Sequence, residues 1–203
     1  GRLAGKLENI GATNDSFFVV YDEGSNFTAG RAWFVLKYFG LEKVYVLNGG
    51  YQEAVRAGLK TSDEVPEAQK SYIELTPNSE MVASYEEIVK YADDPQEGTV
   101  LVDSRSGERF RGEEEPLYDI AGHIPNAVNY FYEENYDDDG RLLADEVLEE
   151  RFADLKDKRN IIVSCGSGVT ACANYIVMDE IGLDPRLFVG SYSLWLKKGN
   201  RVE

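Results

Sequence analysis

The feature that most constrains the fold of this chain is an internal repeat. Each copy has a short apolar run, a helical pattern ended by a glycine, a second apolar run and a short helix, and the copies occupy residues 18–58 and 161–199. The helical patterns stop at Gly40 in the first copy and at Gly182 in the second. The same elements in the same order, at a nearly constant offset, indicate duplicated architecture.

The short apolar runs are rich in β-branched residues and alternate with helical patterns along the chain. This alternation predicts an α/β fold with a parallel central sheet, helices on both faces and right-handed crossovers. Outside the repeat, we expect strands at 100–103 and 127–130, a helix at 84–91 opened by a capping box of Ser84 and Glu87, and a helix at 145–155 that Asp145 caps.

The two copies of the repeat are preceded by segments of different length. A strand–helix portion precedes the second copy, whereas few residues precede the first. Residues 61–80 are polar, contain Pro66 and Pro77, and are predicted to form a linker. We therefore expect residues 1–60 to be the second half of one unit, whose opening half is missing, and residues 81–203 to be a whole unit.

Composition narrows the classes of function. The 203 residues include 37 acidic and 21 basic side chains, which gives a formal net charge of −16. This charge argues against nucleic acid or an anionic membrane as a partner, because both bind clustered Lys and Arg. The sequence has no apolar run long enough to span a membrane and no visible targeting leader. Its two cysteines, Cys165 and Cys172, cannot build a disulfide framework, and reduced thiols favour a cytoplasmic location.

Cys165 is the main candidate for chemistry. It lies between an apolar run, residues 161–164, and a helical pattern, with Gly166 and Gly168 in the turn. Such a turn can aim backbone N–H groups at the sulfur, and the helix N-terminus adds roughly half a positive charge. Both favour the thiolate, which is the nucleophilic form. The alternative is a buried, inert cysteine. A phosphatase is disfavoured, because the sixth residue after the cysteine is Ala171 and not arginine.

The segment 165–170, Cys-Gly-Ser-Gly-Val-Thr, resembles the active-site loop of the rhodanese family of sulfurtransferases, in the form found in tandem, 3-mercaptopyruvate sulfurtransferase-like members. The resemblance is strong over residues 80–200 and looser over 17–60. The other segments that match the family in order and spacing are Asp103-Ser104-Arg105, Arg109-Phe110, Gly122-His123-Ile124-Pro125-Asn126-Ala127 and Gly190-Ser191-Tyr192.

The resemblance implies a rhodanese-like fold of tandem units, each with a parallel sheet covered by helices. Residues 1–60 correspond to the C-terminal half of a non-catalytic domain, in which Asp22 occupies the position of the cysteine. Residues 61–80 correspond to the linker, and residues 81–203 correspond to the catalytic domain.

The resemblance also implies a reaction. Cys165 takes sulfur from a small-molecule donor, holds it as a persulfide and passes it to cyanide or to a thiol acceptor, such as thioredoxin or a low-molecular-weight thiol. Neither a metal nor an organic cofactor is expected. The implied catalytic residues are Cys165, Ser167 and Thr170, and the implied substrate-binding residues are Arg109, Arg105, Gly166, Gly168 and Val169.

Charge decides the expected donor. Thiosulfate-preferring relatives carry two basic residues after the cysteine, where this chain has Gly166 and Ser167. One charge about 4 Å from another contributes roughly 4 kcal/mol at an effective dielectric constant near 20. The monocarboxylate 3-mercaptopyruvate is therefore favoured over dianionic thiosulfate. Thiosulfate sulfurtransferase is one alternative, and a non-catalytic binding or sulfide-carrier module is another. Two residues differ from the family's pattern, namely Leu117 after Glu115-Pro116 and Leu194 before Trp195.

Several candidate residues also have a structural interpretation. Ser167 and Thr170 could cap a helix, Arg109 could pair with Glu113 or Glu114, and packing is favoured for His123 and Cys172. A calcium loop is a further hypothesis, less favoured than a solvated acidic turn. Its ligands would be Asn135, Asp137, Asp139 and Glu146, which fit the spacing of such a loop.

Overall fold

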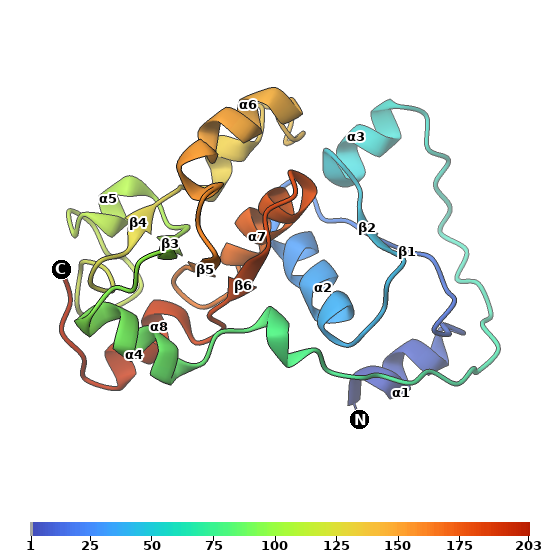
Figure 1. Cartoon of the computed structure of the whole chain (residues 1–203). Coiled ribbons are helices and arrows are strands. Elements are labelled where there is room, and N and C mark those ends of the chain that lie inside the picture. Colours follow the sequence, from blue (N-terminus) through green and yellow to red (C-terminus); the bar gives the residue numbers. More distant parts are fainter. Residues whose placement is uncertain (1) are drawn as a thin grey trace.

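The computed structural model describes residues 2–203, and its strands form two parallel sheets (Figure 1). The smaller sheet pairs β1 (Phe18–Val20) with β2 (Val44–Val46). The larger sheet has the order β4-β3-β5-β6, with β3 at Thr99–Asp103, β4 at Val128–Asn129, β5 at Asn160–Ser164 and β6 at Pro185–Leu187.

Helices connect the parallel strands. They are α1 (Arg2–Asn9), α2 (Phe27–Tyr38), α3 (Gly50–Arg56), α4 (Tyr85–Asp93), α5 (Gly107–Phe110), α6 (Asp145–Arg151), α7 (Ala171–Glu180) and α8 (Ser191–Lys197), with 3-10 turns η1 (Ser79–Met81), η2 (Tyr132–Asn135) and η3 (Ala153–Leu155). Within residues 2–203, none of these helices has the length and apolar character needed to cross a membrane.

Helices cover both faces of the larger sheet. Successive residues of a strand point to opposite faces. Accordingly, Val100 and Val102 of β3 pack in the apolar cluster that contains α7, while Leu101 packs in the cluster that contains α4 and α8. In Figure 1, α4 and α8 lie close to each other, and α7 lies toward α2. The predicted α/β fold with a parallel sheet between helices is confirmed.

The helix starts were predicted with mixed success. Ser84 and Glu87 form the expected capping box at the start of α4. The prediction that Asp145 caps α6 was wrong, because Ala144 holds the cap position and Asp145 is the first helical residue. The Asp145 carboxylate, in the first turn, still lies near the positive end of the helix dipole, and this interaction stabilises the helix. The helix also ends early, at Arg151, before the 3-10 turn η3.

The segment between the two sheets is extended. In the part of the chain that the structure describes, residues 57–78 contain no helix or strand. The division into two domains joined by a linker at 61–80 stays a prediction.

Helices α2 and α7, which are equivalent in the repeat, pack directly against each other. A Cβ atom added at Gly30 would lie 3.3 Å from the backbone nitrogen of Ala173 and from the carbonyl carbon of Cys172. The rings of Trp33 and Phe34 contact Tyr175, with centroids 6.0 and 5.1 Å apart. These residues belong to one apolar cluster, which therefore joins the two copies of the repeat.

Replacing Gly30 by alanine is expected to destabilise the protein. Alanine favours a helix over glycine by about 1 kcal/mol, but the added methyl group would push the α2 and α7 backbones apart, and overpacking costs about 1–3 kcal/mol. The matched control is Gly5→Ala in α1, where an added Cβ meets no atom within 4 Å. The control should raise the free energy of unfolding by about 0.5–1 kcal/mol. Urea denaturation measures both, and equal stabilisation by the two substitutions would contradict the packing argument.

Candidate active site

The Cys165 thiol lies in the loop between β5, which ends at Ser164, and α7, which begins at Ala171. The residue is 1% exposed. The backbone N–H of Gly168 donates to Sγ at 3.1 Å, so the loop does aim a backbone donor at the sulfur. Loop and thiol lie at the carboxyl end of the central strand pair of a parallel sheet, where ligands of open α/β sheets bind.

The two glycines of the loop are needed for different reasons. Gly168 has φ +75°, and a Cβ atom there would collide with the carbonyl oxygen of Val189. Gly166 has no such torsion, but a Cβ atom there would lie 3.1 Å from Oη of Tyr118. Gly168 therefore allows the turn itself, whereas Gly166 leaves room beside the thiol.

The sequence also allowed Ser167 and Thr170 to act as helix caps, and the structure shows no capping hydrogen bond from the side chain at the cap position of α7. Thr170 occupies the cap position of α7 but has helical torsions, φ −65° and ψ −25°, and its side chain makes no capping hydrogen bond. Ser167 is exposed. Val169 is half-buried beside it.

Ser191 is a site residue for which the sequence had suggested no role. It is buried, accepts a hydrogen bond from the N–H of Cys165 at 3.1 Å, and donates to the carbonyl of Phe188 at 2.9 Å. Its φ of 48° is left-handed, which is unfavourable for a residue other than glycine. The first copy has Gly50 at the equivalent position, with φ 66°. The sequence did contain a signal for this role, namely a serine at the position where the first copy has glycine. A residue other than glycine in a left-handed conformation is strained, and such strain clusters at functional sites.

Arg109 lies beside the loop, with its Nη2 3.6 Å from a Cβ atom added at Gly166, and is held by a buried acid. Its Nη2 donates to Glu115 Oε1 at 2.8 Å, and the side chain is 19% exposed. Glu115 is 2% exposed. The expected alternative partners, Glu113 and Glu114, are not the ones found, and Glu113 pairs with Arg111 instead.

The prediction that Arg105 binds substrate needs correction. Its guanidinium is 1% exposed and donates to Asp103, to Glu115 and to the carbonyl of Gly122. The ring of Tyr192 covers it, 4.2 Å from ring centroid to guanidinium carbon. A guanidinium enclosed in this way fixes the position of Glu115, and through it that of Arg109.

The first copy of the repeat holds a carboxylate where the second holds the thiol. Asp22 accepts hydrogen bonds from the N–H groups of Gly24, Asn26 and Ala29 at 2.9, 3.1 and 3.0 Å, and from the Ser25 hydroxyl at 3.0 Å. Burial alone would raise the pKa of Asp22, but these four donors outweigh it and lower the pKa.

The structure contradicts the calcium-loop hypothesis. Asn135 is fully buried, and its amide donates to Asn174 Oδ1 at 2.6 Å and accepts from Arg151 Nε at 3.0 Å. Asp139 pairs with Arg56 at 2.8 Å. Asp137 accepts hydrogen bonds from the N–H groups of Asp139 and Arg141 within the turn, and Glu146 lies in the first turn of α6. The four predicted ligands, Asn135, Asp137, Asp139 and Glu146, therefore do not form one site, and among residues 2–203 no group of three or more His, Cys, Asp or Glu side chains could hold a metal ion.

The contacts of His123 and Cys172 agree with a packing role for both residues. His123 stacks on Phe110, with ring centroids 3.8 Å apart, and its Nδ1 is 2.8 Å from the carbonyl oxygen of the same residue. Cys172 is fully buried on α7, and burial raises the pKa of its thiol to about 12.

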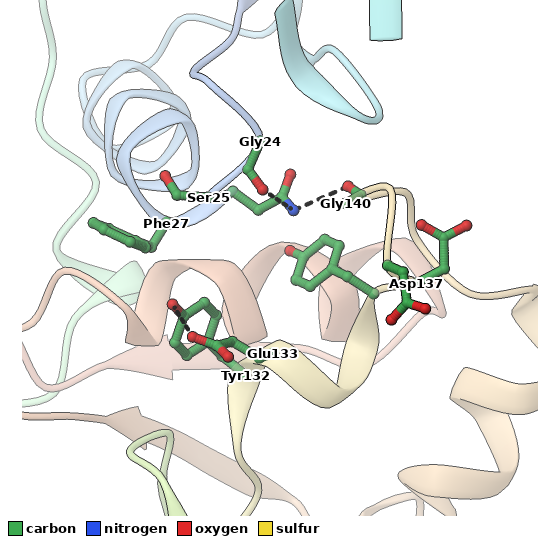
Figure 2. A pocket seen from close by; sticks show the side chains of 10 residues that line it. Gly24, Ser25, Phe27, Tyr132, Glu133, Asp137 and Gly140 are labelled. Atoms are coloured by element: carbon green, nitrogen blue, oxygen red, sulfur yellow. Dashed lines mark hydrogen bonds between the residues drawn. The ribbon is translucent and has the colours of Figure 1, made fainter. Parts of the chain in front are cut away.

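A cavity of about 410 Å³ lies between the loop that follows β1 and the acidic turn after η2 (Figure 2). The amide of Asn26 joins its two sides by donating to the carbonyls of Gly24 and Gly140 at 3.3 and 3.0 Å. The carboxylates of Glu133 and Asp137 line it. None of its lining residues belongs to the thiol loop.

Comparison with known proteins agrees with this geometry. The family model of the rhodanese-like domain matches residues 2–57 and 84–198. The "Probable 3-mercaptopyruvate sulfurtransferase" of Pseudomonas aeruginosa is 36% identical over 98% of this chain and 71% of its own length. The thiosulfate sulfurtransferase of Mus musculus is 31% identical over 94% of this chain and 66% of its own length. The crystal structure of SseA from Escherichia coli, a 3-mercaptopyruvate sulfotransferase of "Rhodanese" fold, has a TM-score of 0.79 and 30% identity over 94% of this chain and 72% of that one.

A sheet of this topology, with a cysteine loop between β5 and α7, together with these matches, defines the class. The chain belongs to the rhodanese family.

The strain at Ser191 can be measured by comparing two substitutions. Ser191→Ala leaves the N–H of Cys165 unpaired and keeps the left-handed backbone, which should cost about 1–3 kcal/mol. Ser191→Gly loses the same hydrogen bond but relieves about 1 kcal/mol of backbone strain. We therefore expect the glycine variant to be the more stable, and both variants to show slower alkylation of Cys165. Equal free energies of unfolding for the alanine and glycine variants would contradict the presence of backbone strain at Ser191.

The Asp22 carboxylate is expected to stabilise the fold in a pH-dependent way. Because its folded pKa is lowered, its contribution is present above the unfolded pKa, about 3.9, and is lost as pH falls through the folded value. Asp22→Asn should lower the melting temperature at neutral pH. The difference from the wild type should shrink as the pH falls below about 3.9 toward the lower folded pKa. A difference that stays constant with pH would show that the carboxylate charge is not involved.

Proposed function

We propose that this protein is a sulfurtransferase that carries sulfane sulfur as a persulfide on Cys165. The observation that carries the proposal is the buried sulfur itself, which accepts the Gly168 N–H in a loop between β5 and α7. A backbone donor at the sulfur favours a thiolate, and a thiolate is the form that attacks sulfur. The names of the relatives, mercaptopyruvate and thiosulfate sulfurtransferases, support the same class of reaction.

In the proposed reaction, 3-mercaptopyruvate is the donor. The Cys165 thiolate attacks the donor's sulfur, and the carbon–sulfur bond breaks. Its electron pair remains on the donor carbon as the enolate of pyruvate, which then takes a proton. In the second half, the thiolate of an acceptor attacks the outer sulfur of the persulfide and releases the Cys165 thiolate. Electrons balance without any cofactor, since each step is a displacement at sulfur.

The loop residues have distinct roles in this proposal. Backbone N–H groups of residues 166–170 stabilise the negative charge on the thiolate and on the persulfide, as in other preorganised anion sites. The exposed Ser167 hydroxyl assists proton movement, and Thr170, whose side chain is not used as a cap, donates to the sulfur. Arg109 binds the carboxylate of the donor.

The charge around the loop supports mercaptopyruvate over thiosulfate. Arg109 is the cation beside Gly166, and the buried Glu115 already offsets part of its charge. A weakly positive site suits a monoanion better than a dianion. Thiosulfate stays the second candidate, because the relative from Mus musculus carries that name.

The remaining parts of the proposal concern organisation and partners. We propose that residues 1–60 and 81–203 are tandem rhodanese-like units of which the second is catalytic, and that the sulfur acceptor is a thiol such as thioredoxin or a small thiol. The two unpaired cysteines support a reducing, cytoplasmic setting.

Intact-mass spectrometry tests the activity directly. After incubation with 3-mercaptopyruvate, we expect the wild type to gain the mass of one sulfur atom and to lose it again when a thiol is added. Cys165→Ser should gain nothing, whereas the control Cys172→Ser should behave as the wild type. Parallel reactions with equal thiosulfate rank the two donors.

The outcomes separate the alternatives. No sulfur adduct with either donor would contradict the proposed function. An adduct that forms but is never passed to an acceptor would favour the sulfide-carrier module over the enzyme.

A further inference from the structure

The geometry points to a second donor group beside Arg109 for recognising the sulfur donor, namely the hydroxyl of Tyr118. A Cβ atom at Gly166 would lie 3.1 Å from Tyr118 Oη and 3.6 Å from Arg109 Nη2. Both groups therefore face the same small space, directly next to Cys165 in the chain. Glycine at this position leaves that space open.

The Tyr118 ring is held in place by its neighbours. It makes an edge contact with the ring of Tyr192, with centroids 5.8 Å apart, and the Arg109 guanidinium carbon lies 5.9 Å from its centroid. Tyr192 in turn is fully buried, and its N–H donates to the Cys165 carbonyl at 3.0 Å. The tyrosine ring is thus fixed relative to the thiol loop by two contacts that do not involve its hydroxyl.

The hydroxyl itself is available as a donor. In the described part of the chain it has no hydrogen-bond partner, although the residue is half-buried. Burial raises the pKa of Tyr118, and the negative charges of Cys165 and Glu115 raise it further against the opposing effect of Arg109. The group is therefore a protonated O–H at neutral pH, which can donate but carries no positive charge.

We propose that Tyr118 is a specificity-determining residue, whose hydroxyl donates a hydrogen bond to the carboxylate or 2-oxo oxygen of an α-keto acid donor bound by Arg109. This inference rests on the proposed function and specifies its substrate class. A hydroxyl adds a directed hydrogen bond without adding charge. It therefore strengthens binding of a keto monoacid more than binding of a dianion, whose affinity depends on total positive charge.

The decisive variant is Tyr118→Phe, which keeps the ring and both of its contacts and removes only the hydroxyl. We expect the KM for 3-mercaptopyruvate to rise about tenfold with little change in kcat, as for a group that binds substrate and transition state equally. The KM for thiosulfate should change less than about twofold. The matched control is Leu117→Ala, because Leu117 is the adjacent side chain and is 68% exposed. Its KM values should equal those of the wild type, and the melting temperatures of all three proteins should agree.

The results distinguish this inference from the proposed function. An unchanged KM for 3-mercaptopyruvate in Tyr118→Phe, or an equal rise for both donors, would overturn the role of Tyr118 while the wild type still transfers sulfur. A wild type that forms no persulfide with either donor would overturn the proposed function, and the role of Tyr118 would fall with it.

Discussion

The direct backbone contact between α2 and α7 is the constraint on which the site depends. At Gly30 the two helices approach closely enough that an added Cβ would lie 3.3 Å from the backbone of α7. The next residue, Arg31, reaches across and donates to the Gly168 carbonyl at 3.4 Å. The N–H of Gly168 is the group that meets Cys165 Sγ. The first copy of the repeat therefore supports the thiol loop from outside, through the hydrogen bond of Arg31 to the Gly168 carbonyl.

The loops after β1 and β5 are similar but hold different groups. In the first copy, three N–H groups and one hydroxyl converge on the Asp22 carboxylate, which supplies its own negative charge. In the second copy, the equivalent position holds a thiol, which can take up a further sulfur atom. Both loops aim backbone N–H groups at the side chain that follows the strand, three at Asp22 and that of Gly168 at Cys165. A carboxylate cannot take up a sulfur atom, so the two loops differ in the chemistry that their central side chain allows.

The sequence predicted the parts of the structure that periodicity and local chemistry determine. Parallel strands, the glycine turn at Gly168 and the capping box at Ser84 all follow from short-range patterns. The partner of Arg109 could not be predicted, because the choice among three consecutive glutamates depends on how an irregular segment folds back on the sheet. The less favoured calcium-loop hypothesis was wrong for a related reason. Its spacing fits a metal loop, but Asn135 is fully buried in an amide network with Asn174, which lies far away in the sequence.

The buried ion network next to the site also depends on contacts between residues that are separated in the sequence. Arg105, Asp103 and Glu115 are each no more than 2% exposed on their side chains. Burying such groups costs free energy that their mutual attraction does not always offset, so a buried ion network is weak evidence for stability alone. Its effect on position is clearer. Arg105 holds Glu115, Glu115 holds Arg109, and Arg109 lies with Tyr118 over Gly166. In a chain with a net charge of −16, this order places the partly offset positive charge of Arg109 next to Gly166 of the thiol loop. A charge at such short range acts on a bound anion more strongly than the charge of the surface, which salt screens within about 8–10 Å.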